Sequence, residues 1–171
     1  VVGTAGDNNV TAGLVYTPGG NDRINSLQDE DVVDLGAGDD VLNVTLGNSN
    51  DNGDSTVTPT ISNTETINVA FSGSGAEAVD QLDLQDTTGI TTFNITRVND
   101  GINTTVTIDN AKASMVNLGI ANSEQPTQTI DFAYDDEELA GASDEATVTL
   151  DDVDVAGLII DERGVADEGF E

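Results

Sequence analysis

The sequence contains no cysteine, histidine or tryptophan, and its four basic residues stand against 33 acidic ones. Without cysteine and histidine, the chain has no thiolate nucleophile, disulfide framework, imidazole base or zinc finger of the usual kinds. A formal charge of −29 repels phosphate groups, which excludes nucleic acid as a partner. No apolar run approaches the roughly 20 residues of a membrane helix, so we expect no direct membrane insertion. The remaining metal chemistry is ligation by hard oxygen atoms, which suits calcium or magnesium.

The acidic excess has two simple explanations. A highly charged chain can be disordered, but the apolar residues here are grouped in short β-branched clusters, which favours folding. The charge can also be a halophilic coat that is spread over the surface without regard to position. The spacing of the acidic residues along the chain distinguishes a coat from a specific site.

Aspartates recur at a spacing of nine residues in the first quarter of the chain. When residues 17–25, 26–34 and 35–43 are aligned, Asp22, Asp31 and Asp40 share the sixth position and an apolar residue takes the eighth. This pattern is close to the nonapeptide G-G-x-G-x-D-x-U-x, in which U is a large apolar residue. A partial copy, GTAGDNNV at residues 3–10, falls five residues out of phase with the three blocks.

This spacing predicts a narrow coil in which two blocks form one turn. Glycines in a six-residue turn can adopt positive φ and let carbonyl groups converge, and a three-residue strand follows. Turns two blocks apart, such as those that end at Asp22 and Asp40, would then stack on one side. A cation between them could take carboxylate and carbonyl oxygens, and calcium tolerates such a flexible set better than magnesium does.

Residues 17–44 resemble the RTX calcium-binding β-roll, and the whole chain is similar to bacterial surface-layer (S-layer) or related secreted RTX-like surface proteins. Residues 3–8, 35–40 and 61–69 also have the character of that family. The resemblance implies several bound Ca²⁺ ions, held by the sixth-position aspartates and by carbonyls of the glycine-rich turns. It maps the metal ligands onto Gly20, Asp22, Asp31, Gly36, Gly38 and Asp40. Asp39 and, in the less regular middle block, Asp29 would add carboxylates.

Other polar stretches are further candidate calcium sites. Asn48, Asn50 and Asn52, followed by Gly53, match the first ligand positions and the glycine of an EF-hand loop, but no glutamate stands at the twelfth position. The alternative for residues 48–54 is an exposed polar loop. The acidic runs at residues 135–138 and 151–154 are expected to be solvated turns, with calcium binding as the alternative.

Beyond residue 63 the chain is organised in short apolar-x-apolar triplets. They lie at residues 67–69, 82–84, 93–95, 106–108, 116–118, 130–132, 148–150 and 158–160. Each triplet except the last predicts a strand with two inward residues around one outward polar residue. Alternate triplets form two series, which recur at similar but uneven steps along the chain. Two strands per coil at this repeat length predict a β-solenoid or an enlarged β-roll.

The predicted fold class is therefore all-β, a calcium-binding β-roll or β-solenoid with short strands. The alternative is an antiparallel β-sandwich preceded by an RTX-like segment, because residues 99–101 (NDG) separate two alternating runs as a hairpin turn would. We expect an RTX-like calcium-binding segment at residues 1–55 and a solenoid or sandwich at residues 56–171, packed as one continuous domain.

The sequence predicts a structural role and no catalytic residues. A narrow solenoid buries little apolar surface, so calcium ions would support its folding. We expect a secreted, extracellular or cell-surface protein, a calcium-stabilised subunit of a surface layer or fibre. We expect its main partners to be copies of itself, and cell-surface polysaccharide to be a second kind of partner. The alternatives are a calcium-rigidified stalk of a large adhesin and an ice-binding module, although the uneven repeat length argues against the regular Thr-x-Asn ladders that an ice-binding face needs.

Overall fold

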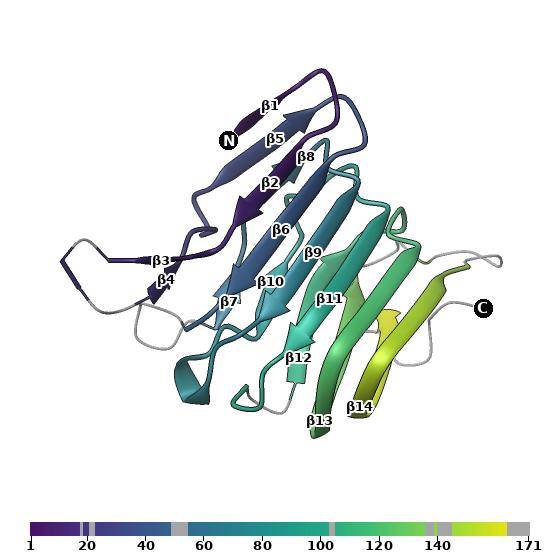
Figure 1. The fold of residues 1–171 in the computed structure, drawn as a ribbon. Helices are drawn as coiled ribbons and strands as arrows, with labels where there is room; N and C mark the ends of the chain where they lie inside the picture. The colour runs from purple at the N-terminus through teal and green to yellow at the C-terminus, as the bar shows by residue number, and fades with distance from the viewer. Residues whose placement is uncertain are drawn as a thin grey trace.

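The computed structural model is a parallel β-solenoid of about four turns, without α-helix in the described part of the chain (Figure 1). The structure describes residues 1–17, 19–20, 23–48, 55–102, 105–135, 139 and 145–163. The prediction of an all-β solenoid is thus confirmed.

Successive coils contribute strands to three parallel stacks. The first sheet contains β2 (Asn9–Ala12), β6 (Val41–Leu46), β9 (Thr66–Phe71), β11 (Thr92–Val98) and the first parts of β13 (Asn117–Tyr134) and β14 (Thr147–Glu162). The second sheet contains β7 (Thr56–Val57), β10 (Gln81–Asp83), β12 (Thr105–Ala111) and the second parts of β13 and β14. The third sheet contains β1 (Val2–Thr4), β5 (Val32–Gly36) and β8 (Thr60–Ser62). Because β13 and β14 bend through both, the first and second sheets are continuous.

The pairing of strands fixes the length of each coil. Thr66 pairs with Thr92, and Thr92 pairs with Asn117, so the central coils are of nearly equal length. The first and last coils are longer, since Asn9 pairs with Val41 and Asn117 with Thr147. The additional residues of the first coil include an antiparallel hairpin of β3 (Leu14–Tyr16) and β4 (Arg23–Asn25), and a 3₁₀ helix, η1 (Gly75–Glu77), lies between β9 and β10.

The two triplet series are confirmed as the first and second sheets, with two changes of register. Leu118, and not Val116, pairs with Phe93, because Val116 precedes the strand and is 36% exposed. Leu82 pairs with Ile108 and not with Val106. Apolar alternation identified the strands, but it could not show which of two adjacent inward residues stands opposite its partner.

The antiparallel alternative is wrong. β11 pairs in parallel with β9 and β13, whereas β12 pairs in parallel with β10 and β13. Residues 99–101 therefore belong to a corner between two sheets and not to a hairpin. The sequence signal of a tight turn was real, but a solenoid corner needs the same turn residues as a hairpin.

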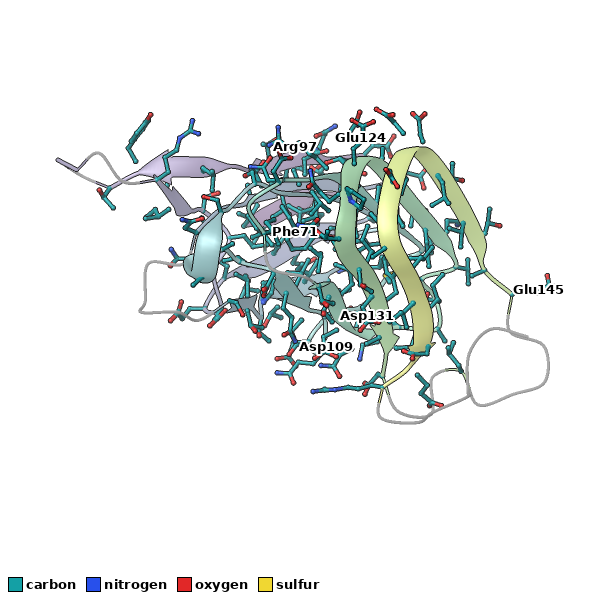
Figure 2. All side chains as sticks on the ribbon, turned by 90° about the horizontal axis from the view of Figure 1, so that it is seen from below. Phe71, Arg97, Asp109, Glu124, Asp131 and Glu145 are labelled. Carbon is teal, nitrogen blue, oxygen red and sulfur yellow. The ribbon has the colours of Figure 1, made fainter. Side chains whose placement is uncertain are left out.

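The core consists of inward ranks that run from coil to coil. Leu42, Ile67, Phe93 and Leu118 form one fully buried rank of the first sheet, and Val44, Val69, Ile95 and Ile120 form the next. Phe93 meets Phe132 of the second sheet edge to face, with 6.0 Å between ring centroids. Figure 2 shows Phe71 between the two sheets, so this core is shared by both.

Residues with positive φ mark the corners. Asn63, Asn110, Asn122 and Asp152 adopt φ between 47° and 59°, which asparagine and aspartate tolerate better than other residues with a Cβ. Asn122 and Asp152 stand at the same point of β13 and β14, between the paired residues of adjacent coils. The acidic run at residues 151–154, predicted to be a solvated turn, thus lies within bent strand β14, where its aspartates are exposed.

Candidate cation site

One corner of the solenoid collects acidic residues from three successive coils. Parallel pairing of β1 with β5 and of β2 with β6 places the turn at residues 5–8 beside the turn at residues 37–40. The third coil follows through the pairing of β6 with β9, which begins directly after a glutamate. We call this group the acidic corner, and its carboxylates belong to Asp7, Asp39, Asp40 and Glu65.

Glycines allow the first two turns to approach each other closely. Gly36 and Gly38 have φ of 93° and 144°, as the sequence predicted for glycines of a tight turn. A Cβ atom on Gly36 would lie 2.2 Å from the carbonyl oxygen of Thr4, and one on Gly38 would lie 2.7 Å from the amide nitrogen of Asp7. Any other residue would push the two coils apart at this corner.

Asp40 is the most buried acid of the corner, with 1% of its surface exposed. Its Oδ1 accepts hydrogen bonds from the backbone amide of Asn8 at 2.6 Å and from Asn8 Nδ2 at 2.9 Å. Its Oδ2 is equally inaccessible, and no donor of the described residues pairs with it. A buried carboxylate oxygen without a partner costs free energy, which a bound cation would offset.

The neighbouring carboxylates are held in place by backbone amides. Glu65 Oε2 accepts a hydrogen bond from the Asp40 amide at 2.8 Å, and Asp7 Oδ1 accepts one from the Asp39 amide at 3.0 Å. Across the described residues, no three acidic side chains converge into a ready metal cluster. A cation at Asp40 would therefore need backbone carbonyl or water oxygens as well, a mixture that calcium accepts and magnesium disfavours.

The remaining predicted ligands lie elsewhere. Asp31 Oδ2 accepts the amide of Gln28 at 2.8 Å, and Asp29 Oδ1 accepts the amide of Thr58 at 2.9 Å. Both aspartates precede β5, whereas the acidic corner follows it. Gly20 lies in the connection between β3 and β4, and Asp22 lies outside the described residues. The structure thus brings together Gly36, Gly38, Asp39 and Asp40 and leaves Asp29 and Asp31 apart from them.

The predicted coil of two nonapeptide blocks is wrong. Asp40 contacts Asn8, which is 32 residues earlier, and Glu65, which is 25 residues later. Asn8 and Glu65 were missed as members of this site. The signal for Asn8 was present, because GTAGDNNV at residues 3–10 aligns without a gap with LGAGDDVL at residues 35–42, the segment on which it stacks.

A second acidic group occupies the outward side of the second sheet. Asp109 Oδ2 accepts a hydrogen bond from Gln81 Nε2 at 2.8 Å, and its Oδ1 lies 3.4 Å from Arg163 Nε. Asn110 connects this pair to Asp83, since it donates to Asp83 Oδ1 at 2.6 Å and accepts from Arg163 at 2.9 Å. Arg163 thus contacts the carboxylate of Asp109 directly and is connected to Asp83 only through the amide of Asn110.

Asp131 lies next to this network and is less well compensated. Burial, and then the negative charges of Asp161 and Asp109, raise the pKa of Asp131 above its ordinary value. Its Oδ1 is inaccessible and has no hydrogen-bond partner among the described residues. In Figure 2, Asp109 and Asp131 lie on the same side of the molecule, opposite Arg97 and Glu124. We call the outward side of the second sheet the acidic face.

The outward side of the first sheet differs in composition. Two of its outward ranks contain no charged residue: one is Asn9, Val41, Thr66, Thr92, Asn117 and Thr147, and the other is Thr11, Asn43, Asn68, Asn94, Gly119 and Thr149. We call this surface the Thr/Asn face. A regular Thr-x-Asn pattern covers β9 and β11 and ends at Gly119.

Amide side chains on the Thr/Asn face form a hydrogen-bonded ladder. Asn43 Nδ2 donates to Asn9 Oδ1 at 2.8 Å, Asn68 Nδ2 to Asn43 Oδ1 at 2.9 Å, and Asn94 Nδ2 to Asn68 Oδ1 at 2.8 Å. Gly119 stands next in the rank and ends the ladder. A shallow groove of about 490 Å³ opens at this point.

The other candidate calcium sites are only partly described. Asn48 Oδ1 accepts the amide of Ser74 at 2.8 Å, and the rest of the EF-hand-like stretch, residues 49–54, lies outside the described residues. Asp135 forms an ion pair with Lys112 at 2.9 Å, and residues 136–138 are likewise not described.

Comparisons with protein-family models, with curated proteins and with solved structures give no match to this chain. Among the described residues, no helix has the length and apolar character needed to cross a membrane. What the chain does must therefore be argued from its own fold and sites.

Proposed function

We propose that this chain is a calcium-stabilised structural unit of an extracellular assembly, a surface layer or a fibre. The observation that supports this most is the buried Oδ2 of Asp40, which has no partner among the described residues, in a corner where three coils place carboxylates. The RTX and S-layer resemblance of the sequence agrees with such a role but stands as part of the proposal.

Calcium at the acidic corner would act as a link between coils. Asp40 is hydrogen-bonded to Asn8 of the preceding coil and to Glu65 of the following coil, so a cation at Asp40, completed by carbonyl or water oxygens, would reinforce contacts between segments that are far apart in the chain. A ligand that binds only the folded chain adds about 2.7 kcal/mol of stability at a hundredfold excess over its dissociation constant. Extracellular calcium sites bind at about 10⁻⁴ to 10⁻³ M, so folding would be completed after export.

Asp40→Asn tests this proposal. In excess chelator, the variant should be at least as stable as the unsubstituted chain, because the neutral amide removes a buried charge and can still accept the hydrogen bonds from Asn8. In millimolar calcium, which is about one to ten times the expected dissociation constant, the order should reverse, with a loss of about 0.4–1.4 kcal/mol. Thermal unfolding followed by circular dichroism measures both, and metal analysis of the purified protein gives the calcium content.

Glu30→Gln is the matched control, because it removes one exposed acidic charge from a turn outside the acidic corner. It should leave the calcium response unchanged. An unchanged melting temperature on chelation, or equal effects of the two substitutions, contradicts a specific site and supports an acidic coat.

A further inference from the structure

Among the described residues, no strand covers the core at the end formed by β14 (Thr147–Glu162). Val148 of β14 follows Leu118 in one inward rank, and Leu150 follows Ile120 in the next. Exposure rises from 1% to 38% in the first rank and from 2% to 56% in the second. In the described part of the chain, β14 pairs with β13 alone, so the other edge of its first-sheet part, residues 147–150, presents unpaired backbone groups. Figure 1 shows β14 at the extreme end of the stack of strands.

The first coil presents the complementary edge. β2 is the opposite border of the same first sheet and, among the described strands, pairs only with β6. Its inward residues, Val10 and Ala12, are only partly buried against the core. A strand added beside β14 must run parallel to it and must point alternate side chains toward the core. β2 meets both requirements, because all strands of this sheet are parallel and share the same inward and outward alternation.

Charge favours contact between unlike ends. β14 contains five acidic residues, whereas β1 to β4 contain none and include Arg23. Two copies meeting through their β14 edges would bring like charges together. Contact of a β14 edge with β2 adds no acidic strand residue to those of β14, and the acids of the first coil, such as Asp7, lie in its turns, so a second copy in head-to-tail orientation is the occupant that the charges of the strands favour.

We propose that the β14 edge of one copy pairs in parallel with the β2 edge of the next, so that the first sheet continues from molecule to molecule. This inference deepens the proposed assembly function and rests on it. The contact is heterologous and leaves a free edge at each end, so it produces filaments and not closed dimers. In repeat proteins, a terminal repeat with a polar outer face is required for solubility, so an apolar end needs another surface to cover it.

Disulfide trapping tests the contact directly, because the chain has no native cysteine. Thr11 and Thr149 belong to one outward rank of the first sheet and lie at its opposite ends. In the proposed contact they become neighbours across adjacent strands at about 4.8 Å, within the Cα separation that a disulfide accepts. The double variant Thr11→Cys, Thr149→Cys should give a ladder of covalent multimers after mild oxidation, seen by non-reducing electrophoresis.

Single variants establish the orientation. A mixture of Thr11→Cys and Thr149→Cys chains should give mainly the mixed dimer, at least fivefold above either homodimer. Homodimers of Thr149→Cys in equal amount would overturn the head-to-tail orientation. A double variant that stays monomeric at all concentrations tested, in calcium and in chelator, would overturn the contact itself, including the case in which another part of the chain covers β14.

Two separate lysine substitutions show whether the exposed inward residues of β14 form the contact. In the double-cysteine chain, Leu150→Lys should abolish the ladder, because it places a charge on the inward rank that the next copy must cover. Thr147→Lys adds the same charge on the outward side of β14 and should preserve the ladder. Both residues are exposed, so neither change should prevent folding.

The same samples separate this inference from the proposed calcium role. A ladder that forms equally in chelator supports the contact and contradicts calcium dependence. If the melting temperature depends on calcium, and Asp40→Asn abolishes this dependence, the calcium-stabilised fold is supported. If no covalent multimers form in the same samples, the contact between copies is overturned.

Discussion

The Thr/Asn face and the acidic face cover the same core but have opposite chemistry. On the first sheet, two outward ranks are uncharged and joined by an amide ladder from Asn9 to Asn94. On the second sheet, Asp83, Asp109, Asp131 and Asp161 lie among few cations. Both sheets have the same inward alternation, so packing of the core does not explain the difference.

The contrast shows that the acidic charge has definite positions. A halophilic coat would be spread over both faces, whereas among the described residues the two outward ranks of the Thr/Asn face contain no acid and the acidic face contains four aspartates. An asparagine ladder needs each side chain to donate to one neighbour and accept from the other, and a carboxylate can only accept. Hydrogen-bond geometry therefore disfavours acids at the asparagine positions of the ladder.

The largest expected effect comes from placing an acid in the ladder. Asn68→Asp removes the donor to Asn43 Oδ1 and sets two acceptors against each other, which should cost about 1–3 kcal/mol. Urea unfolding in chelator measures the loss. Thr147→Asp adds the same charge to the same face outside the ladder and should cost less than about 0.5 kcal/mol. Equal losses would show that charge alone, and not hydrogen bonding, keeps this face free of acids.

Removing an acid from the acidic face should raise the stability of the fold, whereas adding one to the asparagine ladder should lower it. Burial and nearby aspartates raise the pKa of Asp131, so the folded chain binds its proton more tightly than the unfolded chain does. Ionisation of Asp131 therefore destabilises the fold as pH rises above 3.8, and this cost is fully present above the raised pKa. At pH 7, Asp131→Asn should stabilise the chain by less than about 1 kcal/mol, because solvent screens a half-exposed carboxylate.

The pH dependence distinguishes this effect from general charge reduction. Below pH 3.8, Asp131 is protonated in both states, so the advantage of Asp131→Asn should disappear. Asp154→Asn, at an exposed position of β14, removes the same charge and should give a smaller gain at pH 7. A gain that persists at low pH would mean that the asparagine forms new contacts and that the buried charge is not the cause.

Sequence patterns predicted the strands and the two stacks beyond residue 63 well, but they predicted the stacking of the first quarter of the chain wrongly. The apolar-x-apolar triplets identified the inward residues of β9 to β12, because alternation of side chains is a local property. The coil length is not local, since it depends on which strands pair. Three blocks in register suggested two blocks per coil, but the hairpin of β3 and β4 takes up part of that segment, and the true partner of residues 35–42 is the copy at residues 3–10.

The sequence predicted the residues that the second coil contributes to the candidate site, but not the residues that the coils before and after it contribute. Gly36, Gly38 and Asp40 stand out by composition and spacing. Asn8 and Glu65 do not, because they join the site only through the pairing of strands from different coils. Asp131 carries no sequence signal at all, since its burial depends on the sheet that β12, β13 and β14 form around it.

The smallest effect tests why the ladder stops at Gly119. This glycine shows no left-handed φ, so a side chain is compatible with its backbone, and the atoms nearest to an added Cβ belong to the side chain of Asn94, whose Oδ1, at 2.2 Å, would have to move aside. Gly119→Asn should extend the ladder by donating to that oxygen and should raise stability by about 0.5 kcal/mol, partly through the less flexible unfolded chain. Gly119→Asp has the same shape but cannot donate, so it should lower stability. If both variants are destabilised alike, the approach of the Asn94 side chain, and not the hydrogen-bond ladder, requires glycine at this position.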